Sequence, residues 1–143
     1  MRKNMVYIDA NVFVQAVLRD ESEIAASYAK SVLRKIAERD LTASTTVLTW
    51  DELVWACRKA MTFEDALEKG KMLLKTGNLT LEDATKSVIN KASELAEKYG
   101  IKPRDAIHAA TAILGNEKEI ISDDADFDRV KELKRITLAK ASR

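Results

Sequence analysis

The chain has 143 residues, of which 46% are hydrophobic and 33% charged, and its formal net charge is +1. This length fits one domain with a proper core, and the near-neutral charge excludes a global field that attracts nucleic acid, so any such binding must use local patches. The single cysteine excludes an internal disulfide and fits a reducing cytosol, while no apolar stretch approaches the ~18 residues of a membrane span. We therefore predict one soluble cytoplasmic domain over residues 1–143.

The first half of the chain is predicted to alternate between strands and helices. An apolar run at about residues 4–9 is typical of a buried parallel strand, and it turns directly into a helical pattern with Asp9 or Asn11 as cap candidates. The elements expected here are the strand at 4–9, helices at about 11–18 and 22–39, a short strand at 41–44, and a helix from Thr45 or Thr46 to about 61.

The second half continues the alternation. A capping-box pattern at Thr62 begins a helix, and Gly77-Asn78 marks a turn. The elements expected after it are a minor strand or helix approach at 79–81, a helix capped at Thr80 and running to about 98, a helix from Pro103 to Gly115, a strand at 119–122, a turn and short helix at 123–128, and an edge strand at 136–138. Short strands between longer helices predict a three-layer α/β/α domain around a mainly parallel sheet of four to five strands.

Acidic residues stand where the predicted strands end or the helices begin. Asp9 ends the first strand, and Asp124 and Asp126 follow a strand near the end of the chain. Asp105 falls in the first turn of the helix that begins at Pro103. Each has an ordinary structural explanation, because carboxylates cap helices, form turns and are favoured near helix N-termini.

A further carboxylate comes from the helix near residue 50. Glu52 shares a helical face with Leu48 and Trp55, which places it among apolar neighbours rather than in open water. Its neighbour Asp51 is a rival candidate, and the spacing alone does not choose between them. The segment from Thr49 to Glu52 is also a possible capping box.

The structural explanations do not account for the convergence of these acids. The carboxyl ends of parallel strands meet at one edge of a sheet, so Asp9 and Asp124 are expected together there, with Asp105 nearby. Several carboxylates in one place repel one another unless a cation neutralises them. Oxygen ligands without cysteine or a histidine cluster favour Mg²⁺ or Mn²⁺ over Zn²⁺. This chemistry predicts metal-assisted attack of water on a phosphodiester.

Four segments together resemble the PIN-domain ribonucleases, a family that includes the VapC toxins of type II toxin–antitoxin pairs. The first and last are generic strand ends and the third is the most specific, but their order and spacing span nearly the whole domain. The segments are Tyr7–Phe13, Asp51–Val54, Pro103–Ala112 and Ile121–Phe127.

The resemblance implies a set of catalytic, metal-binding acids. It selects Glu52 over Asp51, because the glutamate of the family precedes a small apolar pair, and Asp124 over Asp123. It also implies orienting roles for Asn11 and Ser122, which match polar positions near the site. The acids implied are Asp9, Glu52, Asp105 and Asp124, with Asp126 as a possible fifth metal ligand.

The implied reaction is endonucleolytic hydrolysis of RNA by water activated by one or two Mg²⁺ or Mn²⁺ ions. The implied partners are the RNA substrate, a cognate antitoxin and a second copy of the chain in a homodimer. Two alternatives from the same resemblance are a PIN-like module that binds RNA or protein without cutting, and an RNA-processing nuclease that is not a toxin. A phosphatase is disfavoured, because Ala10-Asn11 follows Asp9 where such nucleophile loops carry a second acid and a threonine.

Four other residues are weaker candidates. Arg104 could contact a phosphate, although a solvated arginine at a helix start is the more common explanation. His108 lies three residues after Asp105 and is expected to face the site or its margin, with a structural role more common than a catalytic one. Trp50 and Trp55 are expected to pack or to form an interface, because stacking on a base requires an exposed ring near the cleft.

Overall fold

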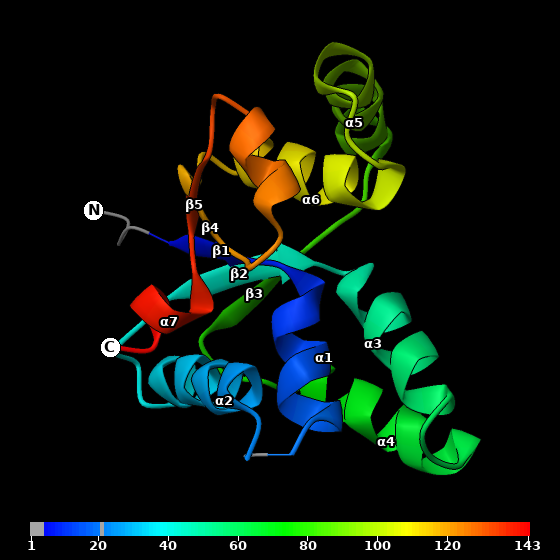
Figure 1. Cartoon of the computed structure of the whole chain (residues 1–143). Helices are drawn as coiled ribbons and strands as arrows, with labels where there is room; N and C mark the ends of the chain where they lie inside the picture. Colours follow the sequence, from blue (N-terminus) through cyan, green and yellow to red (C-terminus); the bar gives the residue numbers. More distant parts are fainter. Residues whose placement is uncertain (1–4, 21) are drawn as a thin grey trace.

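A five-stranded, wholly parallel sheet forms the centre of the computed structural model, which describes residues 5–20 and 22–143 (Figure 1). This confirms the predicted parallel sheet; the predicted start of the first strand near residue 4 lies outside the described residues. The strand order is β3-β2-β1-β4-β5. The strands are β1 (Val6–Ile8), β2 (Ala43–Thr46), β3 (Leu79–Glu82), β4 (Glu119–Ile121) and β5 (Lys134–Ile136).

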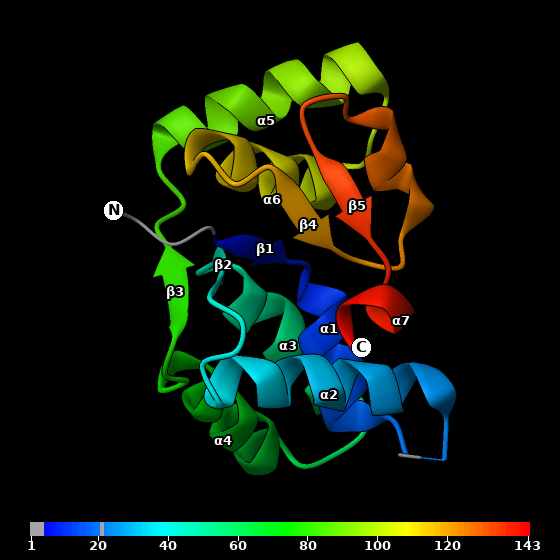
Figure 2. The same ribbon diagram turned by 90° about the vertical axis from the view of Figure 1, so that its left-hand side faces the viewer.

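Helices cover both faces of the sheet, which confirms the three-layer α/β/α architecture. One layer contains α1 (Ala10–Leu18), α2 (Ile24–Ala37), α3 (Thr49–Arg58), α4 (Phe63–Leu74) and α7 (Leu138–Ala141). The other contains α5 (Lys86–Tyr99), α6 (Pro103–Leu114) and the 3₁₀ helix η1 (Ala125–Arg129), and Figure 2 shows the two layers on opposite sides of the strands. Within the described residues, no helix is both long and apolar enough to cross a bilayer.

The central strand β1 contributes to the core on both sides of the sheet. Successive side chains of a strand point to opposite faces, and here Val6 and Ile8 pack with the α1 layer while Tyr7 packs with α5 and α6. All three side chains are buried. Burial on both faces explains why β1 is a continuous apolar run in the sequence rather than an alternating one.

The pairing of β1 fixes which strand ends meet. Tyr7 pairs with Ile120 and Ile8 pairs with Ile121 in the parallel register of β1 and β4. One residue further along, Asp9 lies level with Ser122, and the Asp9 N–H donates to the carbonyl oxygen of Ile121 (3.1 Å). The carboxyl ends of these two neighbouring strands therefore form one edge, the usual ligand-binding edge of an open α/β sheet.

The second strand lies two residues later than predicted. Residues 41–44 were expected as the strand, with a helix from Thr45 or Thr46, but both threonines belong to β2 and the helix α3 begins at Thr49. They are buried, and the Thr45 hydroxyl donates to the carbonyl oxygen of Ile8 (2.8 Å) and bonds the Thr49 hydroxyl (2.7 Å). Threonines are typical helix caps, and only a partner distant in sequence makes them acceptable inside a buried strand.

Two boundaries near the other helices also differ from the prediction. The cap predicted at Thr80 is wrong, because that residue lies in β3 and the side chain of Thr85 instead accepts the N–H of Val88 to cap α5. The last strand ends at Ile136, and Thr137 caps α7 rather than continuing the strand. At Thr80 the sequence offered a minor strand or a helix approach, and the pairing of Thr80 with Ser44 of β2 makes it a strand residue.

A candidate metal-binding site at the edge of the sheet

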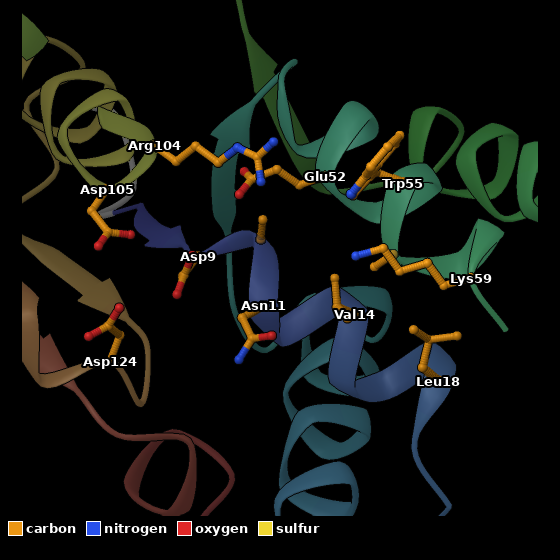
Figure 3. Close-up of a pocket in the computed structure, with 12 residues that line it drawn as sticks. Asp9, Asn11, Val14, Leu18, Glu52, Trp55, Lys59, Arg104, Asp105 and Asp124 are labelled. Atoms are coloured by element: carbon orange, nitrogen blue, oxygen red, sulfur yellow. The ribbon is translucent and has the colours of Figure 1, made fainter. Parts of the chain in front are cut away.

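A cavity of about 440 Å³ opens at the carboxyl edge of the sheet, between α1, α3 and α6. Four of the acids predicted from the sequence line it, and they come from four separate segments (Figure 3). We call this part of the cavity the acidic end; it consists of Asp9, Glu52, Asp105 and Asp124. The fold thus brings together residues that are up to 115 positions apart, 9 and 124, in one cavity.

Asp9 occupies the N-cap position of α1 but makes no side-chain capping hydrogen bond. Its Oδ2 instead accepts the Ser122 hydroxyl (2.7 Å), and that hydroxyl accepts the backbone N–H of Asp124 (3.0 Å). Burial raises the pKa of Asp9 above its ordinary value, and the nearby His108 and the Ser122 hydrogen bond counteract part of that increase. The side chain is therefore positioned toward the cavity rather than used to stabilise the helix.

Glu52 is held by a buried chain of hydrogen bonds, the Tyr7–His108–Glu52 chain. His108 is only 1% exposed; its Nε2 lies 2.7 Å from Oε2 of Glu52 and its Nδ1 lies 2.7 Å from the Tyr7 hydroxyl. An ionised carboxylate can only accept, so Nε2 must carry the proton toward Glu52. The same Nε2 is 3.7 Å from Oδ1 of Asp9.

The protonation of His108 follows from opposing effects. Burial lowers the pKa of the His108 imidazole, but the hydrogen bond to Glu52 and the charges of Asp9 and Glu52 outweigh it, so the pKa is raised overall. Burial also raises the pKa of Tyr7, which keeps its hydroxyl protonated. The Tyr7–His108–Glu52 chain thus presents Nε2 of His108 as a hydrogen-bond donor to the carboxylates.

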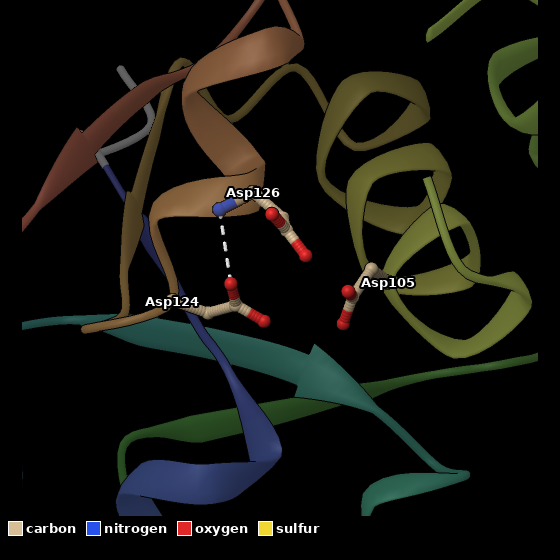
Figure 4. Close-up of side chains that lie close together, drawn as sticks. All are labelled: Asp105, Asp124 and Asp126. Atoms are coloured by element: carbon tan, nitrogen blue, oxygen red, sulfur yellow. Dashed lines mark hydrogen bonds between the residues drawn. The ribbon is translucent and has the colours of Figure 1, made fainter. Parts of the chain in front are cut away.

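Asp105, Asp124 and Asp126 form the most crowded group of acids in the described residues, with one oxygen from each within 4.8 Å of the others (Figure 4). The backbone N–H of Asp126 donates to Oδ1 of Asp124 (2.9 Å), which caps η1. Burial and the neighbouring Asp124 and Asp9 carboxylates raise the pKa of Asp105 to about 6. Like charges at this separation are unfavourable without a compensating cation.

A divalent cation fits this group of residues. Oδ2 of Asp105 is buried and has no hydrogen-bond partner among the residues that the structure describes. A buried carboxylate oxygen without a partner is rare in proteins and calls for an explanation, and an ion is one of the standard ones. The donors present are carboxylate oxygens alone, which suits Mg²⁺ or Mn²⁺.

The structure separates the rival acids by position. Asp51 is exposed and does not line the cavity, whereas Glu52 does. Asp123 accepts the backbone N–H of Leu138 (2.9 Å), at the start of α7, and so faces away from the acids. Asp126 joins the carboxylate group but does not line the cavity.

The remaining candidates are also placed by the structure. Asn11 and Arg104 line the cavity, Asn11 from α1 and Arg104 from the first turn of α6 (Figure 3). The sequence did not point to Tyr7 or Lys59. The signal for Tyr7 was the phase of the strand, since a residue two before Asp9 faces the α6 layer; Lys59 lies seven residues, two helical turns, after Glu52.

The fold and the cavity define an α/β/α domain with a carboxylate site at the strand ends. A sequence model of the PIN domain matches residues 6–133. The chain therefore belongs to the PIN domain family, whose general activity is that of a nuclease. A search of curated proteins gives no significant match.

Solved toxin–antitoxin structures contain chains of the same fold. A chain of VapBC2 from Rickettsia felis, bound to a DNA fragment from its promoter, is 21% identical with a TM-score of 0.70, over 93% of this chain and 98% of that one. A chain of a toxin–antitoxin complex from Klebsiella pneumoniae is 18% identical with a TM-score of 0.65, over 93% and 97%. A chain of VapBC-1 from nontypeable Haemophilus influenzae is 16% identical with a TM-score of 0.67, over 95% and 100%.

Proposed function

We propose that this protein is a Mg²⁺- or Mn²⁺-dependent endoribonuclease that hydrolyses RNA phosphodiester bonds, and that it acts in the cytoplasm as the toxin of a toxin–antitoxin pair. The observation that carries the proposal is the convergence of four carboxylates from four segments on one cavity, together with a buried oxygen of Asp105 that has no hydrogen-bond partner among the described residues. The proposed metal-binding and catalytic acids are those of the acidic end, with Asp126 as a further metal ligand.

The residues at the cavity have different roles in the proposed reaction. The carboxylates of the acidic end and of Asp126 would hold a divalent cation, which would neutralise them and stabilise the negative charge that develops on the phosphate during attack by water. Ser122 and His108 orient Asp9 and Glu52 by donating hydrogen bonds to them. Arg104 lines the same cavity and offers a guanidinium to a phosphate oxygen, which offsets the repulsion between the acids and the substrate.

The proposed partners are a cognate antitoxin and a second copy of the chain. Support for the antitoxin comes from the fold, which is shared with chains of complexes described as toxin–antitoxin pairs. Homodimerisation is proposed from the family resemblance alone.

The test is cleavage of RNA by the purified chain. We expect cleavage with Mg²⁺ or Mn²⁺ and none after addition of a chelator. Asp9→Asn should reduce the rate by about 100-fold or more, because removal of groups that merely orient a metal ligand already costs about 10- to 100-fold. Asp123→Asn is the matched control, since its carboxylate faces α7 and not the cavity.

Unchanged cleavage in a folded Asp9→Asn variant contradicts the proposed site. Absence of cleavage by the wild type, with RNA still bound, favours the alternative of a non-cleaving RNA-binding module. Cleavage in a protein whose gene has no small antitoxin gene beside it favours the alternative of an RNA-processing nuclease.

A further inference from the structure

The cavity extends beyond the acids along two helices. Its second part, which we call the aromatic end, is lined by Val14, Leu18, Trp55, Ala56 and Lys59. Figure 3 shows the carboxylates of Asp9, Asp105 and Asp124 at one end and Trp55, Lys59 and Leu18 at the other. Both ends belong to one cavity, which leaves room for a polynucleotide with a phosphate at the acids to extend onto the aromatic end.

The helical repeat accounts for this arrangement. Asn11, Val14 and Leu18 follow one face of α1, and neighbours among them are three or four positions apart. Glu52, Trp55 and the C-cap residue Lys59 follow one face of α3 with the same spacing. Seven residues of helix span about 10 Å, which is ample for a nucleotide beside the cleaved bond.

The two tryptophans of the chain have different surroundings. Trp50 is partly buried against the core of the α1 layer, and its ring lies where a side chain on Gly70 would collide with it. Trp55 is 47% exposed and lines the cavity. Trp50 therefore has the packing role predicted for it, whereas Trp55 meets the condition for stacking on a base, an exposed ring near the cleft.

Two cations accompany the exposed ring. The Arg58 guanidinium lies 4.4 Å from the centroid of the Trp55 ring, and the Lys59 ammonium lies 5.5 Å from it. Cation–π contact orients the ring and places positive charge over it. A base has an aromatic face and its backbone a negative charge, so this pairing of an indole with cations is complementary to a nucleotide.

We infer that Trp55, Lys59 and Arg58 form a subsite for a nucleotide that flanks the cleaved phosphodiester, with its base stacked on Trp55 and its phosphate near the two cations. The inference rests on the proposed function for the position of the cleaved bond. Stacking on a protein ring requires a base outside a double helix, so the subsite selects single-stranded nucleic acid. It recognises ring faces and therefore tolerates different bases.

The test is binding of a fluorescein-labelled, single-stranded oligoadenylate, measured by fluorescence anisotropy in the presence of Mg²⁺. All variants are made in an Asp9→Asn background, which prevents cleavage. Adding Trp55→Ala should weaken binding roughly 10-fold or more, and Trp55→Phe should restore most of it. The control is Phe63→Ala, which removes an aromatic side chain that is 60% exposed but outside the cavity, and should leave binding unchanged.

Lys59→Ala should weaken binding and lower the slope of log Kd against log salt concentration by about 0.7, the value for one phosphate contact to a single strand. Lys75→Ala, an exposed lysine outside the cavity, is its matched control. An oligoadenylate–oligouridylate duplex should show little dependence on Trp55.

The inference is overturned if the parent and a folded Trp55→Ala variant bind oligoadenylate with equal affinity. This holds even if the variant loses binding to a protein partner. Failure of the proposed function gives a different result: oligoadenylate binding depends on Trp55, but the wild-type protein cleaves no RNA. In the converse case, the protein cleaves RNA but Trp55 does not matter; the proposed function then stands and the inference about Trp55 fails.

Discussion

The carboxylates on the two sides of the acidic end differ in the hydrogen bonds that they accept from the protein. On one side, Asp9 and Glu52 accept hydrogen bonds from Ser122 and His108, so fixed donors of the protein orient both carboxylates. On the other side, Asp105 faces Asp124 and Asp126, and one buried oxygen of Asp105 has no partner among the described residues.

The difference indicates which groups are preorganised and which await a ligand. Carboxylates held by fixed donors keep their orientation whether or not an ion is bound, while a crowded carboxylate such as Asp105, with an oxygen that has no partner among the described residues, gains most from a cation. The predictions below test each side separately, beginning with the largest expected effect.

The hydrogen-bonded side of the acidic end depends on His108. His108→Gln cannot reproduce both contacts of the imidazole, so Glu52 loses its fixed orientation and kcat for RNA cleavage should fall about 10- to 100-fold with little change in KM. The measurement is steady-state cleavage with Mg²⁺, accompanied by urea unfolding to verify that the variant folds. Full activity in folded His108→Gln shows that the Tyr7–His108–Glu52 chain supports only the core.

Repulsion among the crowded carboxylates of Asp105, Asp124 and Asp126 should lower the free energy of unfolding of the metal-free protein. In chelator, Asp105→Asn should raise the free energy of unfolding by up to about 1 kcal/mol, once solvent screening of a half-buried group is allowed for. Excess Mn²⁺ should reverse the order by stabilising the wild type alone.

The pH dependence of this difference follows from the raised pKa. Asp105 has a pKa of about 6 in the folded protein against the ordinary 3.8, so between these values the folded state binds more protons than the unfolded state. The wild type therefore loses stability relative to Asp105→Asn as pH rises through about 6, and the gap is small near pH 4. A gap that is constant across this range, measured by urea unfolding in chelator, contradicts the electrostatic account.

The sequence predicted the layers, the parallel sheet and the acids more readily than the interactions that hold them. Asp9 could be identified because a buried apolar run ends at it, and Asp105 because Pro103 marks the helix start. The Tyr7–His108–Glu52 chain could not, since residues 101 positions apart must meet before the hydrogen bond between Tyr7 and His108 exists. The same reason explains the misplaced second strand, in which the Thr45 hydroxyl donates to the carbonyl oxygen of Ile8 in β1.

The exposure of Trp55 was likewise beyond the sequence. Trp50 and Trp55 lie on the same helix, and only the packing of α4, with Gly70 beneath the Trp50 ring, shows which of them is covered. Helical periodicity placed Trp55 beside Glu52 but gave no measure of its contact with solvent.

The most direct test of a cation at the crowded carboxylates is an anomalous difference map from crystals soaked in MnCl₂. We predict a manganese peak inside the cavity among Asp9, Asp105 and Asp124, and its loss in crystals of the Asp105→Asn variant treated in the same way. A wild-type map without manganese in this cavity, or with a peak that persists in the variant, contradicts the account.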